Sequence, residues 1–232
     1  MSKNVLILGA SSDIGKDVTK YFLKAGYNVF LHYNNNKPKI KSKKVKFFKY
    51  NFNKIENYKN FINKIKNIKF SSFVNLIGYI DNRELSKASF NDLNNSLKIN
   101  FIFPILISNY ISTKMIKAKY GRILHCSSIG VKFGGGINTY TYALAKHCLE
   151  FIPQHYKINS KSNVLYNILR IGVTDTKIHK RMKKNLHLKK RLKLIPIERM
   201  AKPREIALYI LNLITENNSY MTGQTITVSG GE

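Results

Sequence analysis

The sequence predicts an α/β fold in which helices cover both faces of one parallel sheet of seven strands. Short apolar runs alternate with longer segments of helical period along all 232 residues. Several of the apolar runs are uninterrupted, which is typical of strands that are buried on both faces. No internal repeat and no linker divides the chain, so we expect a single doubly wound domain over residues 1–232.

The individual elements follow from these patterns. Strands are expected at 5–8, 28–33, 45–50, 73–76, 122–127, 164–170 and 225–228. Helices are expected at 14–25, 55–65, 91–115, 140–156 and 203–214. The last helix carries Pro203 in its first turn, where the missing N–H is tolerated.

Composition excludes several classes of protein. Hydrophobic residues make up 44% of the chain, which is enough for a core and excludes intrinsic disorder. Cys126 and Cys148 are the two cysteines, without the close Cys/His spacing of a metal site, so we expect no disulfide framework, no metal and a reducing compartment. The apolar run 5–8 is too short for a secretory signal, and the run 101–107 contains Pro104 and is too short to span a bilayer. We therefore expect a cytoplasmic protein with no membrane partner.

The formal net charge of +28 is compatible with binding to nucleic acid or to a membrane surface. Lysine supplies 33 of the 40 basic residues, and these lysines are spread along the chain together with 26 asparagines. Because that combination is typical of an AT-rich coding sequence, we attribute most of the charge to composition. The exception is the segment 177–193, where nine of 17 residues are Lys or Arg and none is acidic.

A glycine-rich turn follows the first expected strand. The residues Gly9-Ala-Ser-Ser-Asp-Ile-Gly15 lead directly into a segment of helical period. Such a turn presents backbone N–H groups and the positive end of a helix dipole to a pyrophosphate, so it predicts a dinucleotide site. A plain connection between strand and helix is the alternative. Asp13 can cap the helix, but its charge opposes a bound anion.

The segment after the second expected strand bears on the choice of dinucleotide. It reads Tyr33-Asn-Asn-Asn-Lys37 and contains no acidic residue to bind the adenosine ribose hydroxyls of NAD. We therefore favour NADP over NAD, with Lys37 either close to the 2′-phosphate or simply solvated.

Tyr142 and Lys146 form the candidate catalytic pair. Because they are four residues apart on an expected helix, the ammonium is expected to lie near the phenol and to lower its pKa from about 10. Such a phenol can transfer a proton near neutral pH. A surface pair without a catalytic role is the alternative, and Ser127 and Ser128 at the end of the fifth expected strand favour the catalytic interpretation.

In this order, the motifs resemble those of the short-chain dehydrogenase/reductase family over essentially the whole chain. The matching stretches are the turn 9–15, Asn75-Leu-Ile-Gly78, Ile99-Asn100, Ser127-Ser128, Tyr142 with Lys146, Arg170-Ile-Gly-Val-Thr-Asp-Thr176, and the C-terminal stretches 199–206 and 220–231. The sequence departs from the family's pattern at Leu8, Asp13, Asn51, Ile77 and Ile171. Each departure affects cofactor binding or a turn, and none removes a catalytic group.

The resemblance implies a Rossmann-type fold and hydride transfer between NADP(H) and a carbonyl compound. Tyr142 would give a proton to the carbonyl oxygen, and Ser128 would hold that oxygen, with Ser127 as the alternative serine. Lys146 would tune Tyr142 and hold the nicotinamide ribose, and Asn100 would anchor a relay water. The implied cofactor-binding residues are Gly9, Ser11, Ser12, Asp13, Ile14, Gly15, Tyr33, Asn34, Asn51, Phe52, Asn75, Ile77, Gly78, Tyr142, Lys146, Gly172, Val173, Thr174 and Thr176.

The general similarity is strongest to 3-oxoacyl-(acyl-carrier-protein) reductases, so we expect reduction of a ketone to a secondary alcohol. The basic residues 177–195 resemble the family's substrate lid and imply an anionic or carrier-linked substrate, although a solvated cationic face is the alternative. The rival hypotheses are a keto-sugar reductase of surface-glycan biosynthesis and a nucleic-acid-binding protein on an inherited dinucleotide fold. The intact catalytic set disfavours nucleic acid. The resemblance also implies a homodimer or homotetramer.

Overall fold

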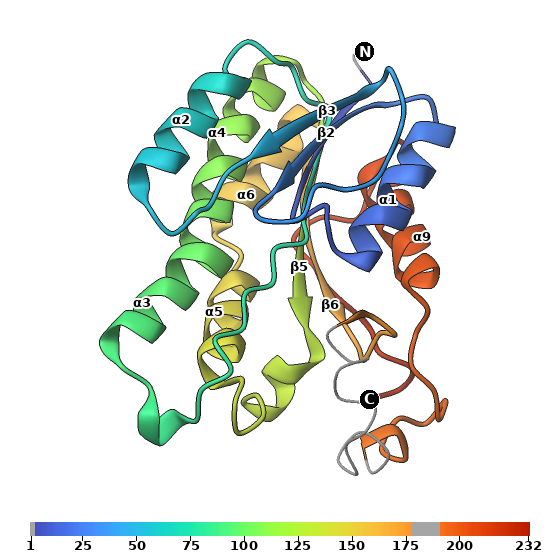
Figure 1. The fold of residues 1–232 in the computed structure, drawn as a ribbon. Coiled ribbons are helices and arrows are strands. Elements are labelled where there is room, and N and C mark those ends of the chain that lie inside the picture. The colour runs from blue at the N-terminus through green and yellow to red at the C-terminus, as the bar shows by residue number, and fades with distance from the viewer. Residues whose placement is uncertain (1–2, 178–190) are drawn as a thin grey trace.

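A computed structural model describes residues 3–177 and 191–232, and in these residues seven strands form one parallel sheet (Figure 1). The strands are β1 (Asn4–Leu8), β2 (Asn28–Tyr33), β3 (Val45–Lys49), β4 (Ser72–Asn75), β5 (Gly121–Ser128), β6 (Val164–Ile171) and β7 (Thr225–Val228). Their order across the sheet is β3-β2-β1-β4-β5-β6-β7, and every neighbouring pair is parallel. The predicted fold class is therefore confirmed.

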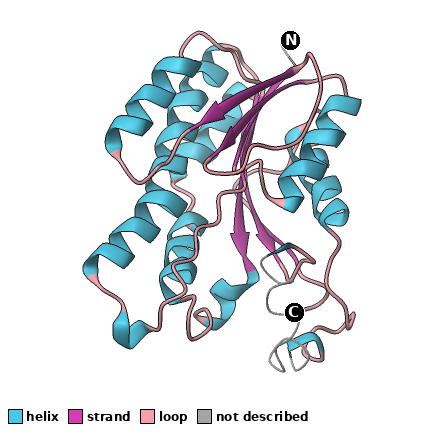
Figure 2. Cartoon of the chain, in the orientation of Figure 1, coloured by secondary structure: helices cyan, strands magenta, loops and turns pink. Residues whose placement is uncertain are grey.

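Helices lie on both faces of the sheet (Figure 2). The α-helices are α1 (Asp13–Lys24), α2 (Ile55–Ile65), α3 (Phe90–Leu97), α4 (Phe103–Lys117), α5 (Tyr140–Glu150), α6 (Gln154–Ile158) and α9 (Pro203–Ile214). Short 3-10 turns cover Leu85–Lys87, Ile129–Phe133 and Asn159–Ser162. Helices α1 and α9 pack together on one side of the sheet, and the other α-helices lie on the opposite side (Figure 1).

Two apolar cores, one on each face, explain why the central strands are uninterrupted apolar runs. On β1, Leu6 and Leu8 point into the core formed with α2 and α4, while Val5 and Ile7 point into the core formed with α1 and α9. All four of these side chains are completely buried. A strand that is covered on both faces can place an apolar side chain at every position, so its pattern is continuous.

The helix predicted over 140–156 is wrong in its second half. Helix α5 ends at Glu150, Phe151 is extended with a ψ of 114°, and a separate short helix starts at Gln154. Pro153 is the physical reason, because proline has no N–H to donate and disfavours the helical conformation of the residue before it. The candidate catalytic pair, Tyr142 and Lys146, lies before this break.

The helix predicted over 91–115 is interrupted by a π-helical turn, Lys98–Ile102, that joins α3 to α4. By length and composition, the whole stretch Phe90–Lys117 is the one described helix that could cross a membrane. Its residues Ile107, Ile111 and Met115 are instead buried against the sheet, so this observation is weak evidence for a membrane span.

The carboxyl ends of the parallel strands meet at one edge of the sheet, where β1 has β2 on one side and β4 on the other. Because the strand order reverses between β1 and β4, a crevice forms here, and open α/β sheets bind their ligands in such a crevice. Most of the segment 177–195, predicted to be a basic substrate lid, lies outside the described residues.

Candidate active site

The turn after β1 requires glycine for two reasons. Gly9 has a φ of +72°, which side-chain-bearing residues rarely adopt. A Cβ at Gly9 would lie only 2.7 Å from the Leu76 carbonyl oxygen and 2.8 Å from the Ile77 nitrogen. Gly15 is similarly restricted, because a Cβ there would lie 2.7 Å from the Ala10 carbonyl oxygen. The chain therefore passes close to β4 and places the first turn of α1 at the crevice.

Ser12 caps α1 and ties the turn together. Its hydroxyl accepts a hydrogen bond from the Gly15 N–H at 3.0 Å and donates one to the Gly9 carbonyl at 3.0 Å. The helix therefore begins with its N-terminal end facing the crevice, where N–H groups and the helix dipole favour an anion.

Asp13 is the first residue of α1, and its carboxylate makes two contacts. Oδ1 pairs with Lys16 at 3.0 Å, and Oδ2 accepts a hydrogen bond from the Lys177 backbone N–H at 2.9 Å. Partial burial raises the pKa of Asp13, but the hydrogen bonds from Lys177 and Lys16 outweigh burial, so the net effect lowers the pKa. The carboxylate therefore stays charged at neutral pH, with both oxygens engaged by donors.

A cavity of about 420 Å³ runs from this turn to the end of β5. Sixteen of the predicted site residues line it: Gly9, Ser11, Ser12, Asp13, Ile14, Asn34, Asn51, Phe52, Ile77, Gly78, Ser128, Tyr142, Lys146, Gly172, Thr174 and Thr176. Five predicted residues do not line it: Gly15, Tyr33, Asn75, Asn100 and Val173. Gly15 and Asn75 shape the turns beside the cavity, and Lys37 places its ammonium 4.6 Å from the centre of the Phe47 ring.

Ser128 and Tyr142 are brought together at the β5 end of the cavity. Tyr142 is partly buried in the wall of the cavity, and a hydrogen bond joins its phenol to the Ser128 side chain. Ser128 also accepts the Gly130 N–H at 3.2 Å, which fixes its hydroxyl at the start of a 3-10 turn. The neighbouring Ser127 instead points its hydroxyl toward the Lys146 carbonyl at 3.4 Å. The structure therefore places Ser128, not Ser127, on the phenol.

Lys146 lies one helical turn after Tyr142, with its Nζ 5.7 Å from the centre of the Tyr142 ring. The ammonium donates hydrogen bonds to the Cys126 carbonyl at 2.6 Å and to the Ile77 carbonyl at 2.8 Å. Burial lowers the pKa of Lys146 to about 8, and the opposing effects of Cys126 and Glu150 offset only part of that shift. Lys146 thus joins the turn after β4 to β5.

The expectation that Lys146 lowers the pKa of Tyr142 is wrong for the chain as it stands. Burial raises the pKa of Tyr142 to about 12, and the Ser128 hydrogen bond offsets only part of that effect. The spacing of the pair was correctly identified, but the ammonium is directed at two carbonyls, and the phenol is shielded from water. Tyr142 is therefore fully protonated at neutral pH.

Asn100 lies in the π-helical turn and is completely buried. Its side-chain oxygen accepts the Tyr79 N–H at 2.7 Å, and its amide nitrogen donates to the Tyr79 carbonyl at 2.9 Å. Asn100 therefore fixes the loop after β4 at Tyr79, and Tyr79 lines the cavity. A π-helical turn often marks a functional position because it re-aims a side chain within a helix.

Sequence reasoning missed His32, which lines the cavity beside the glycine turn. One ring nitrogen, Nδ1, lies 3.3 Å from the Gly9 N–H, and the other, Nε2, lies 2.9 Å from the Tyr50 carbonyl. The ring also stacks on Phe52 with 4.3 Å between the centres. Burial lowers the pKa of His32 to about 4, so the ring is neutral. A histidine within an apolar strand carries no sequence signal of this role.

Comparison with known proteins identifies the family. Residues 9–232 match a family model described as enoyl-(acyl carrier protein) reductase, and the chain belongs to the short-chain dehydrogenase/reductase family. The chain is 28% identical to the 3-oxoacyl-(acyl-carrier-protein) reductase of Buchnera aphidicola over 99% of this chain and 87% of that protein. It is also 28% identical to the acetoacetyl-CoA reductase of an Acinetobacter species, with 68% of this chain and 63% of that protein covered.

Solved structures share the fold at low sequence identity. A 3-oxoacyl (acyl-carrier-protein) reductase from Agrobacterium tumefaciens with NADP bound matches with a TM-score of 0.86 and 22% identity, covering 99% of this chain and 94% of that chain. A 4-hydroxyisoleucine dehydrogenase mutant in complex with NADH and succinate matches with a TM-score of 0.90 and 21% identity, covering 99% and 98%. At this identity the likeness shows the fold, and the family places the chain among the oxidoreductases.

The residues of the cavity fit a nicotinamide dinucleotide. The two glycines that tolerate no Cβ leave the turn open at the N-terminus of α1, as a pyrophosphate requires. The cavity continues without interruption to Lys146 and Tyr142, and Thr174 and Thr176 line its other wall. Within residues 3–177 and 191–232, no three His, Cys, Asp or Glu side chains gather as metal ligands do.

Proposed function

We propose that the protein is an NADPH-dependent ketone reductase that acts on a 3-oxoacyl thioester, carried by acyl carrier protein or coenzyme A. The observation that carries this proposal is the phenol of Tyr142, hydrogen-bonded to Ser128 in the same cavity as the glycine turn. That arrangement supports the proposal because it would set a proton donor and a hydroxyl beside the nicotinamide of a bound dinucleotide.

Reduction needs a hydride, which a bound reduced nicotinamide supplies, and a proton, which the chain supplies. Tyr142 is protonated at neutral pH because its pKa is about 12. It remains a far stronger acid than bulk water, whose pKa is 15.7, so it can protonate an oxygen that gains negative charge. Ser128 holds the same oxygen through its hydroxyl, which contributes electrostatic stabilisation in a site shielded from water.

Lys146 orients the site and provides its positive charge. Its ammonium sits between the turn after β4 and the end of β5, so the charge favours a developing negative charge on Tyr142 as the proton leaves. Asn100 holds the Tyr79 backbone and so fixes the loop after β4, including the Ile77 carbonyl that Lys146 binds. A relay water at Asn100 remains part of this proposal.

The names of the similar proteins support a thioester substrate. Both the carrier-protein reductase and the acetoacetyl-CoA reductase are named for thioesters of 3-oxo acids. The excess of basic residues in 177–193 also suits an anionic carrier or coenzyme.

The preference for NADPH rests on the adenosine end of the cavity. The described residues that line it there, such as Asn34 and Asn51, include no acidic side chain that would bind ribose hydroxyls and repel a 2′-phosphate. The similar solved structures contain NADP in one case and NADH in another.

We propose that the protein works in the cytoplasm.

We also propose a homodimer or homotetramer. Helix α5 and the edge strand β7 are the expected contacts, and every residue of β7 is at least partly accessible. Light scattering at micromolar concentration tests this assignment, and a monomer would contradict it.

The decisive experiment follows NADPH and NADH oxidation at pH 7 with acetoacetyl-CoA and with a panel of keto-sugars. We expect turnover of acetoacetyl-CoA with NADPH, and a loss of at least about 100-fold in kcat for Tyr142→Phe, the scale of general acid catalysis. Tyr140→Phe is the matched control, because Tyr140 lies on the same helix but does not line the cavity.

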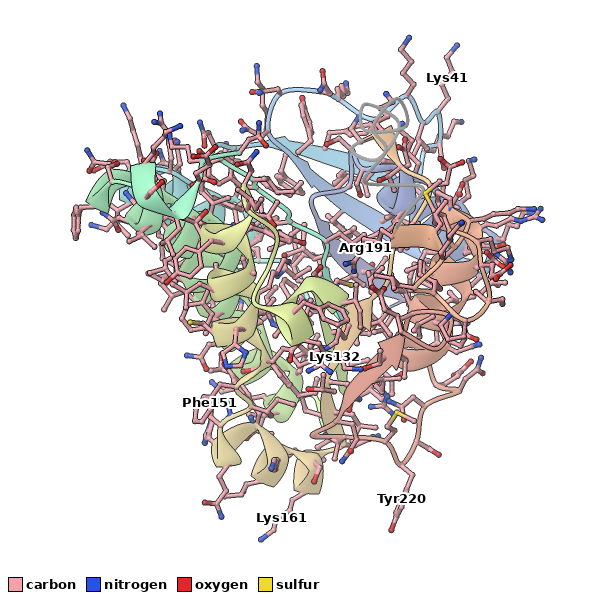
Figure 3. All side chains as sticks on the ribbon, turned by 90° about the horizontal axis from the view of Figure 1, so that it is seen from below. Lys41, Lys132, Phe151, Lys161, Arg191 and Tyr220 are labelled. Carbon is pink, nitrogen blue, oxygen red and sulfur yellow. The ribbon has the colours of Figure 1, made fainter. Side chains whose placement is uncertain are left out.

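Other outcomes of this experiment would replace the proposal. Activity on keto-sugars with none on thioesters would assign the enzyme to glycan synthesis. Tight, salt-sensitive duplex binding without any dinucleotide binding would indicate a nucleic-acid-binding protein. Figure 3 shows that the basic side chains labelled Lys41 and Lys161 project from opposite ends of the molecule, so these two do not share one basic surface.

A further inference from the structure

Asp13 connects two parts of the cavity wall that are far apart in the sequence. Its Oδ2 accepts the Lys177 backbone N–H at 2.9 Å, across 164 residues. Its Oδ1 pairs with Lys16, one turn along α1. A glycine, the residue that the family's pattern has at this position, has no side chain with which to make either contact. The bond is therefore a property of this chain's own sequence.

The segment 173–177, whose last residue binds Asp13, is also attached to the protein through its earlier residues. Thr174 forms a β-bridge with Ala201, and the Asp175 N–H donates to the Ala201 carbonyl at 2.8 Å. Ala201 comes just before α9, which packs on α1. Residues 173–177 are thus attached to Ala201 through residues 174 and 175, and to Asp13 at the end of the glycine turn through residue 177.

The bond crosses the wall of the cofactor cavity. Ser11, Ser12 and Asp13 line the cavity on the side of the turn, and Thr174, Thr176 and Lys177 line it on the side of β6. A dinucleotide that lies along the cavity has to pass between these two groups of residues. The contact between Asp13 and Lys177 spans this passage.

The charge of Asp13 is compatible with an anion nearby because both carboxylate oxygens are already engaged. The ammonium of Lys16 offsets the charge at Oδ1, and the Lys177 N–H donates to Oδ2. The arrangement converts a residue expected to repel phosphate into one that bridges the two walls.

We propose that Asp13 is a positioning residue. Its contact with Lys177, which we call the clasp, holds the segment after β6 against the glycine turn that precedes α1. This clasp slows both the entry and the release of the dinucleotide. The inference rests on the proposed cofactor site for its consequence, but the contact between Asp13 and Lys177 is made by the chain alone. The two can therefore be tested separately.

The first experiment measures amide hydrogen exchange of the protein without cofactor. In Asp13→Ala we expect the Lys177 amide to exchange at least about fivefold faster, which corresponds to about 1 kcal/mol for a charge-assisted hydrogen bond near the surface. Asp17→Ala is the matched control, because Asp17 pairs with Lys20 at the same spacing and the same 3.0 Å but holds no distant segment. Equal exchange rates at Lys177 in the two variants would overturn the clasp.

The second experiment measures binding and release of NADPH by stopped-flow, using the fluorescence of NADPH itself. Asp13→Ala should raise both the association and the dissociation rate at least about fivefold, so that Kd changes less than either rate. Asp13→Asn, which keeps an oxygen acceptor without the charge, should lie between Asp13→Ala and the unmodified protein, and Asp17→Ala should stay within twofold of the unmodified protein.

Two results would refute the role in cofactor exchange. Rates within twofold of the unmodified protein in Asp13→Ala would show that the contact does not limit passage. A faster association with an unchanged dissociation rate would show that the carboxylate acts only by repelling the incoming phosphates. If the unmodified protein binds neither NADPH nor NADH, the proposed function fails, while the exchange experiment still decides whether the clasp exists.

Discussion

Two buried neutral histidines should make the protein sensitive to mild acid. His32 and His125 are 4% and 0% exposed. Burial lowers the pKa of His32 to about 4, and burial together with the nearby Lys146 lowers that of His125 to about 3. Because the unfolded chain binds protons at a pKa of about 6.5, it gains protons over the folded chain as the pH falls below that value. Stability is therefore fully present above about pH 6.5 and is lost toward pH 4.

The size of the effect follows from these values. At pH 5 an unfolded histidine is almost completely protonated, whereas both buried rings remain neutral in the folded protein. Lowering the pH from 7 to 5 therefore removes about 2 kcal/mol of unfolding free energy for each histidine, about 4 kcal/mol for the two. Domains of this kind are stable by only about 5–15 kcal/mol, so the loss is a substantial fraction. The carboxyl groups with lowered pKa values, such as Glu205 at about 2, titrate below this window.

Urea unfolding at pH 7 and pH 5, followed by circular dichroism, measures this loss. We expect His32→Asn and His125→Asn each to reduce the difference between the two pH values by about 2 kcal/mol, whatever the substitution does to stability at pH 7. His147→Asn is the control, because His147 is exposed and should leave the difference unchanged. An unaltered pH dependence in both buried variants would show that the rings are not neutral in the folded protein.

Two further predictions concern the serines and the glycine turn. Ser128→Ala should lower kcat about 100-fold or more, the scale for removing one donor to a developing oxyanion. Ser127→Ala should change kcat less than threefold, because the Ser127 hydroxyl faces the Lys146 carbonyl. Equal losses in the two variants would mean that the wrong serine has been assigned. Gly9→Ala should lower the unfolding free energy by about 1–3 kcal/mol more than Gly26→Ala. Both glycines have positive φ, but of the two only Gly9 faces backbone atoms within 3 Å. Chemical denaturation of the two variants measures the difference, and equal losses would contradict the close approach of the turn to β4.

Most of the fold could be predicted from the sequence because the strands are buried on both faces. The apolar runs at β1 and β6 could be located to within a residue or two, since burial on two faces leaves a continuous signal. The break after α5 was missed because the apolar period continues through Phe151 and Ile152, and a local rule, Pro153, overrides it. The π-helical turn at Asn100 was missed because one inserted residue barely changes a helical period.

The candidate site was predictable where function depends on residue type and spacing, and not where it depends on burial. Glycines that must approach backbone closely, and a tyrosine and lysine four apart, are visible in a sequence. The pKa values of Tyr142 and Lys146 are not, because they depend on how much water the surrounding chain excludes. The contact between Asp13 and Lys177 joins residues 164 apart and has no local signal at all.

Burial also sets the protonation state that Tyr142 favours at neutral pH. A phenolate would be needed to accept a proton from an alcohol, but the pKa of about 12 at Tyr142 makes that species scarce at neutral pH. Lys146 provides the main compensating charge for such a phenolate, and its own pKa of about 8 means that this charge is lost as the solution becomes alkaline. The conditions that would ionise the phenol therefore also remove the cation that would stabilise it. At neutral pH the predominant form of Tyr142 is therefore the protonated phenol, which is the form that the proposed reduction of a ketone requires.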